Sequence, residues 1–203
     1  KTGQAVTHAS GYDNADSQFG HFNTRDDGFA GAAGATDIFV GGRYVYAGGS
    51  WVGNIARWDG TDWVSLESGV NDAVYAIAVN GDDVYVGGDF TQAGSLLVNR
   101  ITKWNKSTGV WTKMGSGVNG GVYAITVSGS DVYIGGAFTQ EGMNSVNHIA
   151  KWNGTTWSAL GTGVNDWVHA IAVIGTDVYA GGHFTQAGVS PVGYIAKWDG
   201  AAW

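Results

Sequence analysis

The sequence predicts an all-β fold, a β-propeller of about four four-stranded blades, from three observations. Nearly the same phrase returns at intervals of 46 to 48 residues. Glycine-containing hairpin signals separate short apolar segments, and these segments are apolar on both faces. Internal repeats of this length are typical of propellers and solenoids.

The repeat is clearest in three segments of twelve residues, "DVYVGGDFTQAG", "DVYIGGAFTQEG" and "DVYAGGHFTQAG". One tryptophan per unit sets the spacing of 46, 48 and 46 residues: Trp58, Trp104, Trp152 and Trp198. Glycine pairs also stay constant, at Gly87 and Gly88, Gly135 and Gly136, and Gly181 and Gly182. We expect these tryptophans and glycines to form the structural frame of each blade.

The second unit shows how one blade is built. "VYAIAV" (residues 74–79) leads through Asn80-Gly81 into "DVYVGG", then into "NRITKWN" and "GVWTKMG". Asn-Gly between two apolar runs is the strongest short hairpin signal. Strict alternation puts Tyr75, Ile77 and Val79 on one face and Val74, Ala76 and Ala78 on the other. Since both faces are apolar, we expect both to be covered by neighbouring sheets, as in a propeller.

The two ends of the array differ from its middle. The first unit lacks the "FTQAG" loop and spans 39 residues from Gly48 to Gly87, so a degenerate first blade is expected. The last unit stops at Trp203, where its predecessor continues "SALGTGV", so the last blade is predicted to lack its outer strand. Residues 1–36 are polar and unlike the repeats; we interpret them as an N-terminal extension and candidate strand donor, and residues 37–203 as the propeller.

Composition excludes several classes of partner and chemistry. Ten Lys and Arg against seventeen Asp and Glu give a net charge of −7, which disfavours nucleic acid and anionic membrane surfaces. No apolar run is long enough for membrane insertion. The absence of cysteine removes disulfides, thiolate metal sites and cysteine nucleophiles.

Candidate ligand-binding residues follow the constant glycine pairs. The next position varies as Asp89, Ala137 and His183, and we hypothesise that Asp89 and His183 converge at the propeller mouth; an ordinary loop position is the competing and favoured interpretation. The repeated amides are Gln92, Gln140 and Gln186. They have the donors and acceptors to bind sugar hydroxyls, although a Thr-Gln pair that closes a turn explains the repetition better.

Two further sets of residues, and the catalytic motifs that the sequence lacks, bear on its chemistry. His169 takes the place of Tyr75 and Tyr123 in its unit and is interpreted as a packing residue. Asp13 and Asp16, in "DNADS", have the oxygen density of a calcium loop without the glycine and glutamate of an EF-hand, so calcium is the one candidate cofactor. Neither a Ser-His-Asp order with nucleophile-elbow context nor a phosphate loop is present, and no catalytic residue is predicted.

An apolar stretch followed by Gly-Gly and a spaced tryptophan, at a period of about fifty residues, resembles the kelch pattern. The fuller phrase, Gly-Gly-x-Phe-Thr-x-Ala-Gly followed by Asn-x-Ile-Ala-x-Trp-Asn-Gly-x-x-Trp, is similar to secreted propeller repeats of bacterial surface proteins and of the fungal cortical-marker type, over residues 37–203.

This resemblance, together with ten Trp and nine Tyr and the missing catalytic set, indicates a non-catalytic extracellular or cell-surface protein that acts in adhesion, carbohydrate binding or structural assembly. The unpaired edge expected on the last blade adds the possibility of filament growth by strand exchange. The expected partners are glycans, other surface proteins or copies of the chain itself. The alternative is a glycan-active hydrolase or lyase with carboxylates at the propeller mouth, with Asp89 and His183 as acid and base, because such folds carry both kinds of function.

Overall fold

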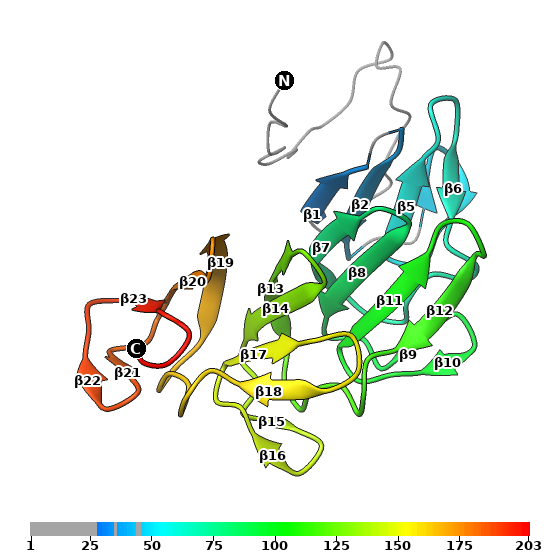
Figure 1. Cartoon of the computed structure of the whole chain (residues 1–203). Coiled ribbons are helices and arrows are strands. Elements are labelled where there is room, and N and C mark those ends of the chain that lie inside the picture. Colours follow the sequence, from blue (N-terminus) through cyan, green and yellow to red (C-terminus); the bar gives the residue numbers. More distant parts are fainter. Residues whose placement is uncertain (1–27, 35, 44–45) are drawn as a thin grey trace.

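The structure is a computed structural model that describes residues 28–34, 36–43 and 46–203. All regular elements of these residues are β-strands, so they contain no helix that could span a membrane. Four antiparallel sheets follow one another in chain order and pack face to face (Figure 1). This arrangement confirms the predicted all-β propeller.

Each sheet runs from an innermost to an outermost strand. The first blade contains β1 (Gly28–Ala33), β2 (Ile38–Gly42), β5 (Ile55–Trp58) and β6 (Trp63–Ser65). The second contains β7 (Val74–Asn80), β8 (Asp83–Gly88), β11 (Ile101–Asn105) and β12 (Val110–Lys113). The third contains β13 (Val122–Ser128), β14 (Asp131–Gly136), β17 (Ile149–Trp152) and β18 (Trp157–Ala159). The fourth contains β19 (Val168–Ile174), β20 (Asp177–Gly182) and β23 (Ile195–Trp198).

A small hairpin interrupts each blade between its second and third strands. These hairpins are β3 (Tyr46–Ala47) with β4 (Ser50–Trp51), β9 (Gln92–Ala93) with β10 (Leu96–Leu97), β15 (Gln140–Glu141) with β16 (Asn144–Ser145), and β21 (Gln186–Ala187) with β22 (Ser190–Pro191). Ala93 of β9 bridges to Val70, which lies in the connection from the first blade. Val118 bridges to Glu141 and Val164 to Ala187 in the same way, so the hairpins of the second, third and fourth blades fix each of these blades to the segment that enters it.

A β-bulge corrects the predicted faces of the innermost strands. Val74 pairs with Gly88 and Ala76 with Gly87, so Tyr75 is the extra, unpaired residue. Because the bulge resets the alternation, Val74 and Ile77 point the same way, against Gly41 of the preceding blade. The assignment of Val74 and Ile77 to opposite faces was wrong.

The cores lie between blades and at the outer tryptophans. Tyr85 and Ile101 of the second blade pack into the core of the third, where Phe138 is fully buried. The indole Nε1 of Trp157 donates a hydrogen bond of 2.8 Å to the Met114 carbonyl, in the connection from the blade before it. The frame predicted from the repeat thus joins neighbouring blades as well as building each one.

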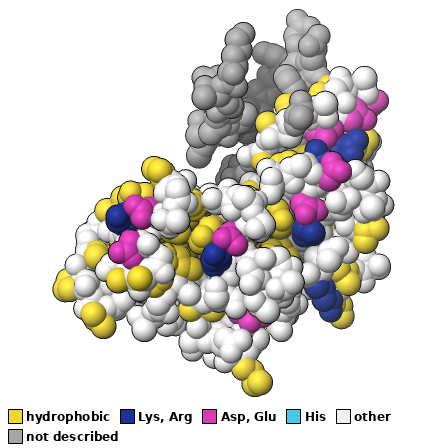
Figure 2. Space-filling model, viewed as in Figure 1, with side chains coloured by type: hydrophobic (Ala, Val, Ile, Leu, Met, Phe, Trp, Pro, Cys, Tyr) yellow, Lys and Arg dark blue, Asp and Glu magenta, His cyan; other side chains and the backbone are white. Residues whose placement is uncertain are grey.

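The first blade is complete, although its sequence departs from the repeat. Arg57 pairs with Asp37 at 3.5 Å as Lys103 pairs with Asp83 at 2.9 Å, which aligns the two units. Figure 2 shows such pairs of opposite charge as separate spots on the surface. The glycine equivalent to Gly87 is therefore Gly41, at the usual spacing, and the interval of 39 residues counted from Gly48 was a misalignment.

The predicted domain boundary at residue 37 also shifts. Residues 28–33, which the sequence assigned to the extension, form β1 and pair with β2 in the first blade. They give their strand to their own first blade, not to the last one. The rest of the predicted extension, residues 1–27, lies outside the described residues. The fourth blade has three strands, as predicted.

Candidate functional site

Aromatic side chains from successive innermost strands form a continuous row. Tyr75, Tyr123 and His169 are the bulged residues of β7, β13 and β19. The ring centroids of Tyr75 and Tyr123 are 5.5 Å apart, edge to face, and those of Tyr123 and His169 are 5.3 Å apart, stacked at 7°. The bulge turns each ring out of the strand alternation, which is a common use of bulges near functional sites.

The row continues into the fourth blade through two more rings. His183 lies 4.5 Å from His169, centroid to centroid, and stacks on Trp167 at 6.1 Å. Trp167 also meets the edge of Tyr123 at 5.9 Å, and 43% of its surface is exposed. We call Tyr75, Tyr123, Trp167, His169 and His183 the aromatic row.

A carboxylate stands at the other end of the row. Tyr75 donates a hydrogen bond of 2.9 Å from its hydroxyl to Asp89. Burial, together with this bond, raises the pKa of Tyr75 to about 12, so its hydroxyl remains a donor at neutral pH. Gly121 makes room for the pair, because a Cβ there would lie 2.7 Å from Asp89 Oδ1 and 2.9 Å from Tyr123 Cε1.

Burial lowers the pKa of His169, and the nearby His183 lowers it further. His169 is therefore neutral at pH 7, with one ring nitrogen as donor and the other as acceptor. The row combines apolar ring faces with hydroxyl, imidazole and carboxylate groups along its edge. Such a surface can stack on a ligand ring and hydrogen-bond to its substituents.

The structure places Asp89 and His183 along the same row but does not pair them. Asp89 contacts Tyr75, whereas His183 contacts His169 and Trp167. No hydrogen bond or ion pair among the described residues joins Asp89 to His183. Convergence of the two side chains therefore stays a prediction.

The repeated glutamines lie in the small hairpins. Gln92 and Gln186 donate from Nε2 to the carbonyls of Gly94 and Gly188, at 2.9 and 3.0 Å. Gln140 occupies the same position in β15, and its backbone N–H donates 3.0 Å to Asn119 Oδ1. These contacts favour the turn-closing interpretation, and a ligand role for the three glutamines stays a prediction.

Sequence reasoning missed the residue that closes these turns. Asn71 Oδ1 accepts hydrogen bonds from the backbone N–H groups of Thr91 (2.8 Å) and Gln92 (3.0 Å), and its Nδ2 donates to Thr91 Oγ1 at 3.0 Å. Asn119 and Asn165 repeat the arrangement. The phrase Gly-Val-Asn, present in all three units, was the signal for it.

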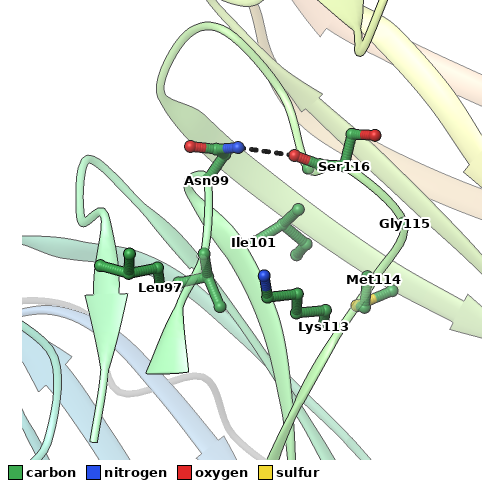
Figure 3. A pocket seen from close by; sticks show the side chains of 9 residues that line it. Leu97, Asn99, Ile101, Lys113, Met114, Gly115 and Ser116 are labelled. Carbon is green, nitrogen blue, oxygen red and sulfur yellow. Dashed lines mark hydrogen bonds between the residues drawn. The ribbon is translucent and has the colours of Figure 1, made fainter. Parts of the chain in front are cut away.

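Two shallow pockets lie between the hairpins and the connections that join blades. One, of about 280 Å³, is bounded by Leu97, Ile101 and Met114, with Asn99 donating a 2.7 Å hydrogen bond to the Ser116 carbonyl at its rim (Figure 3). The equivalent pocket one unit earlier, of about 250 Å³, is lined by Trp51 and Gln92 among others. Of the predicted ligand residues, Gln92 lines this second pocket.

The structure does not test the predicted calcium site. Asp13 and Asp16 lie outside the described residues. Within residues 28–34, 36–43 and 46–203, no three histidine, aspartate or glutamate side chains gather closely enough to hold a metal ion. Calcium binding therefore stays a prediction about the N-terminal segment.

Comparison with known proteins gives a fold and a family. No curated protein matches the chain. The crystal structure of the computationally designed Ika4 protein is 17% identical, with a TM-score of 0.59, and the match covers 91% of this chain and 98% of that one. The designed Ika8 protein is 18% identical with a TM-score of 0.54 over 85% of this chain, which spans 45% of that protein's length. These identities show the fold alone.

The sequence itself carries the family. The model of the Rax2 C-terminal beta propeller domain matches residues 61–203, which include the second, third and fourth blades and the strand-three tryptophan frame from Trp104 onward. The match confirms that the repeats are those of a β-propeller family; membership of the kelch group stays a prediction. The chain belongs to the family of the Rax2 C-terminal β-propeller domain.

Proposed function

We propose that this propeller is a non-catalytic module that binds carbohydrate at the cell surface or outside the cell. The observation that carries the proposal is the aromatic row, in which rings from three successive blades lie 4.5 to 6.3 Å apart. Trp167, with 43% of its surface exposed, offers a ring on which a sugar ring can stack. The extracellular location rests on the resemblance of the repeats to secreted propeller repeats.

The polar groups of the row suit a neutral glycan better than an acidic one. Tyr75 keeps its proton, since its pKa is about 12, and His169 is neutral because its pKa is lowered. Asp89 supplies a carboxylate that would repel an anionic sugar, as does the net charge of −7. We therefore expect binding to hydroxyl-rich, uncharged sugars.

A non-catalytic role is supported by how Asp89 is held. Its carboxylate accepts the Tyr75 hydroxyl, and His183 is stacked among rings on another blade. A glycosidase needs two carboxyl groups on either side of one bond, about 5 to 10 Å apart. Asp89 is hydrogen-bonded to a ring of the row, whereas Asp166, whose charge acts on His169, accepts its hydrogen bond from the backbone N–H of Trp167.

The test is a screen of neutral and acidic glycans with the native protein and two matched tryptophan variants. Trp167→Ala removes the exposed ring of the row, and Trp51→Ala removes an equally exposed ring, 49% against 43%, at the outer pocket. We expect Trp167→Ala to weaken binding about tenfold, the value of a stacked ring, and Trp51→Ala to leave it unchanged.

Two results would contradict this proposal. Binding that falls with Trp51→Ala and persists with Trp167→Ala would move the ligand to the pocket beside Gln92. A native protein that binds none of the glycans would leave no role for the row in carbohydrate recognition.

A further inference from the structure

Each of the first three blades packs against the next blade at one glycine. A Cβ added at Gly87 would lie 2.5 Å from Val122 Cγ1 and 3.1 Å from Ile125 Cδ1 of the next blade. Gly135 meets Val168 and Ile171 at the same two distances, and Gly41 meets Val74 and Ile77 in the same way. We call this contact the glycine seat. It requires a glycine on one blade, and a valine and an isoleucine three residues apart on the bulged strand of the next.

Among the residues that the structure describes, no side chain fills the seat on the fourth blade. A Cβ added at Gly181 would meet only the Tyr194 carbonyl oxygen, at 3.9 Å. Ile195 is 65% exposed, whereas its equivalents Ile101 and Ile149 are 1% and 0% exposed. Figure 2 shows apolar side chains gathered over the part of the molecule that the fourth blade forms. The fourth blade therefore exposes the surface that the preceding blades bury. We call this surface, around Gly181 and Ile195, the open face.

The first blade does not fit this face. In β1 the register puts Gly28 opposite Gly42 and Gly31 opposite Val40, as Val74 lies opposite Gly88 and Ile77 opposite Val86. Glycines thus stand where the seat needs valine and isoleucine. The first blade of the same chain, or of a second copy docked head to tail, would leave the seat unfilled.

The outer edge of the fourth blade repeats the contacts of the third. Trp203 packs on Trp198 with ring centroids 5.7 Å apart, as Trp157 packs on Trp152 at 5.2 Å. Its Nε1 donates 2.8 Å to the Leu160 carbonyl, just as Trp157 donates 2.8 Å to that of Met114. In the third blade this tryptophan begins the outer strand β18, which leads into the next blade.

We propose that the open face binds a further blade of the same repeat, whose bulged inner strand inserts a valine and an isoleucine beside Gly181. The three interfaces inside the chain give the geometry of the contact. The inference is independent of the carbohydrate proposal, because the seat lies between blades and no residue of the aromatic row fills it.

The test extends the 203-residue protein with a second copy of residues 158–203 placed after Trp203, and reports on the open face with a single thiol. The chain has no cysteine, so Ile195→Cys introduces a unique one. Thiol-reagent labelling of Ile195→Cys should be fast in the 203-residue protein and at least about tenfold slower in the extended protein, since a docked blade must open before the reagent enters. Leu97→Cys, with 69% exposure in the parent residue, is the control and should react at the same rate in both.

A matched variant isolates the seat. In the extended protein, glycines replace the appended copies of Val168 and Ile171, which reproduces what β1 has at these positions. The chain length and the new outer strand stay the same, so protection of Ile195→Cys should be lost if the two side chains dock the blade. Equal labelling rates in the two extended proteins would overturn the proposal. Protection of Ile195→Cys already in the 203-residue protein would also overturn it, because a second copy would then cover the face.

A measurement without the extension guards against failure of the fusion to fold. Gly181→Leu fills the seat of the 203-residue protein itself, and Gly135→Leu is its counterpart between packed blades. We expect Gly181→Leu to unfold at the same urea concentration as the native protein, and Gly135→Leu at a much lower one. Equal losses for the two variants would show that the face is already occupied.

Discussion

The glycine seat makes a sharp prediction about two chemically identical substitutions, Gly135→Ala and Gly181→Ala. Both glycines lie on the second strand of a blade, and neither has a positive φ. At Gly135 the new methyl carbon would lie 2.5 Å from Val168 Cγ1, 2.9 Å from Val168 Cβ and 3.1 Å from Ile171 Cδ1. At Gly181 it would meet one carbonyl oxygen at 3.9 Å, an ordinary contact.

The expected free energies follow from these distances. Overpacking of a close-packed interface costs about 1–3 kcal/mol, because two blades must separate or the Val168 side chain must leave its rotamer. Replacing glycine in a strand returns about 0.5–1 kcal/mol through the lower entropy of the unfolded chain. Gly135→Ala should therefore lower the free energy of unfolding by about 1–2 kcal/mol, and Gly181→Ala should leave it unchanged or raise it by about 0.5 kcal/mol.

The assay is urea denaturation followed by tryptophan fluorescence, with Gly87→Ala as a second packed-seat variant. A shift of the midpoint at constant slope reports stability alone. If Gly181→Ala lost as much stability as Gly135→Ala, the open face would be covered in solution. If Gly135→Ala were neutral, the contact between Gly135 and Val168 would not hold the third and fourth blades together.

The remaining predictions concern titration and turn closure. Burial lowers the pKa of both His148 and His169 below the usual 6.5, so the unfolded chain takes up protons first as the pH falls, and stability should decline below about pH 6.5. The urea midpoint of a His148→Gln variant should decline less steeply with falling pH. An equally steep decline would rule out His148 as a source of the effect. Asp89→Asn should bring the pKa of Tyr75 down from about 12, although burial should keep it above 10. The titration of the hydroxyl can be followed by ultraviolet absorbance. An unchanged titration would mean that Asp89 does not hold the hydroxyl. Asn119→Ala should lower the free energy of unfolding by about 1–2 kcal/mol, because the backbone N–H groups of Thr139 and Gln140 lose their acceptor. Asn144→Ala, at the exposed hairpin tip, is the control and should change the urea midpoint far less.

The fold could be predicted because its signal is repeated. One Asn-Gly hairpin or one buried tryptophan is weak by itself, but the same residues at intervals of 46 to 48 describe a blade several times over. The first blade was harder. "VGGRYVYAGG" contains two glycine pairs, and the second, after "YVYA", matches "DVYVGG" more closely in composition. The contact of Gly41 with Val74 and the ion pair of Arg57 with Asp37 show which glycine pair belongs to the frame.

Strand β1 and the bulges had no local signal. "GFAGAA" contains glycine and alanine where the other inner strands have β-branched residues, so its strand depends on pairing with β2 and packing on β7. The bulge at Tyr75 is likewise a property of the pairing between β7 and β8. Because Tyr75, Tyr123 and His169 of the aromatic row are bulged residues, the row could not be deduced from strict alternation, although the repeat does align His169 with the two tyrosines.

Within each blade, the residues that set the distance between blades differ from the residues that face the aromatic row. This difference explains why the position after each glycine pair can vary freely between repeats. The glycine seats hold successive blades at one distance, and the bulged rings of Tyr75, Tyr123 and His169 consequently recur 5.3 to 5.5 Å apart. The varied slot after each glycine pair lies beside those rings and sets what they present: Asp89 at one end and His183 at the other. Gly121 and Trp167, equivalent residues in successive units, show the same freedom, one leaving space for a carboxylate and the other adding an exposed ring. For the carbohydrate binding proposed above, a change in the seat should therefore weaken the binding of every glycan alike, whereas a change in the slot should alter which glycan is bound.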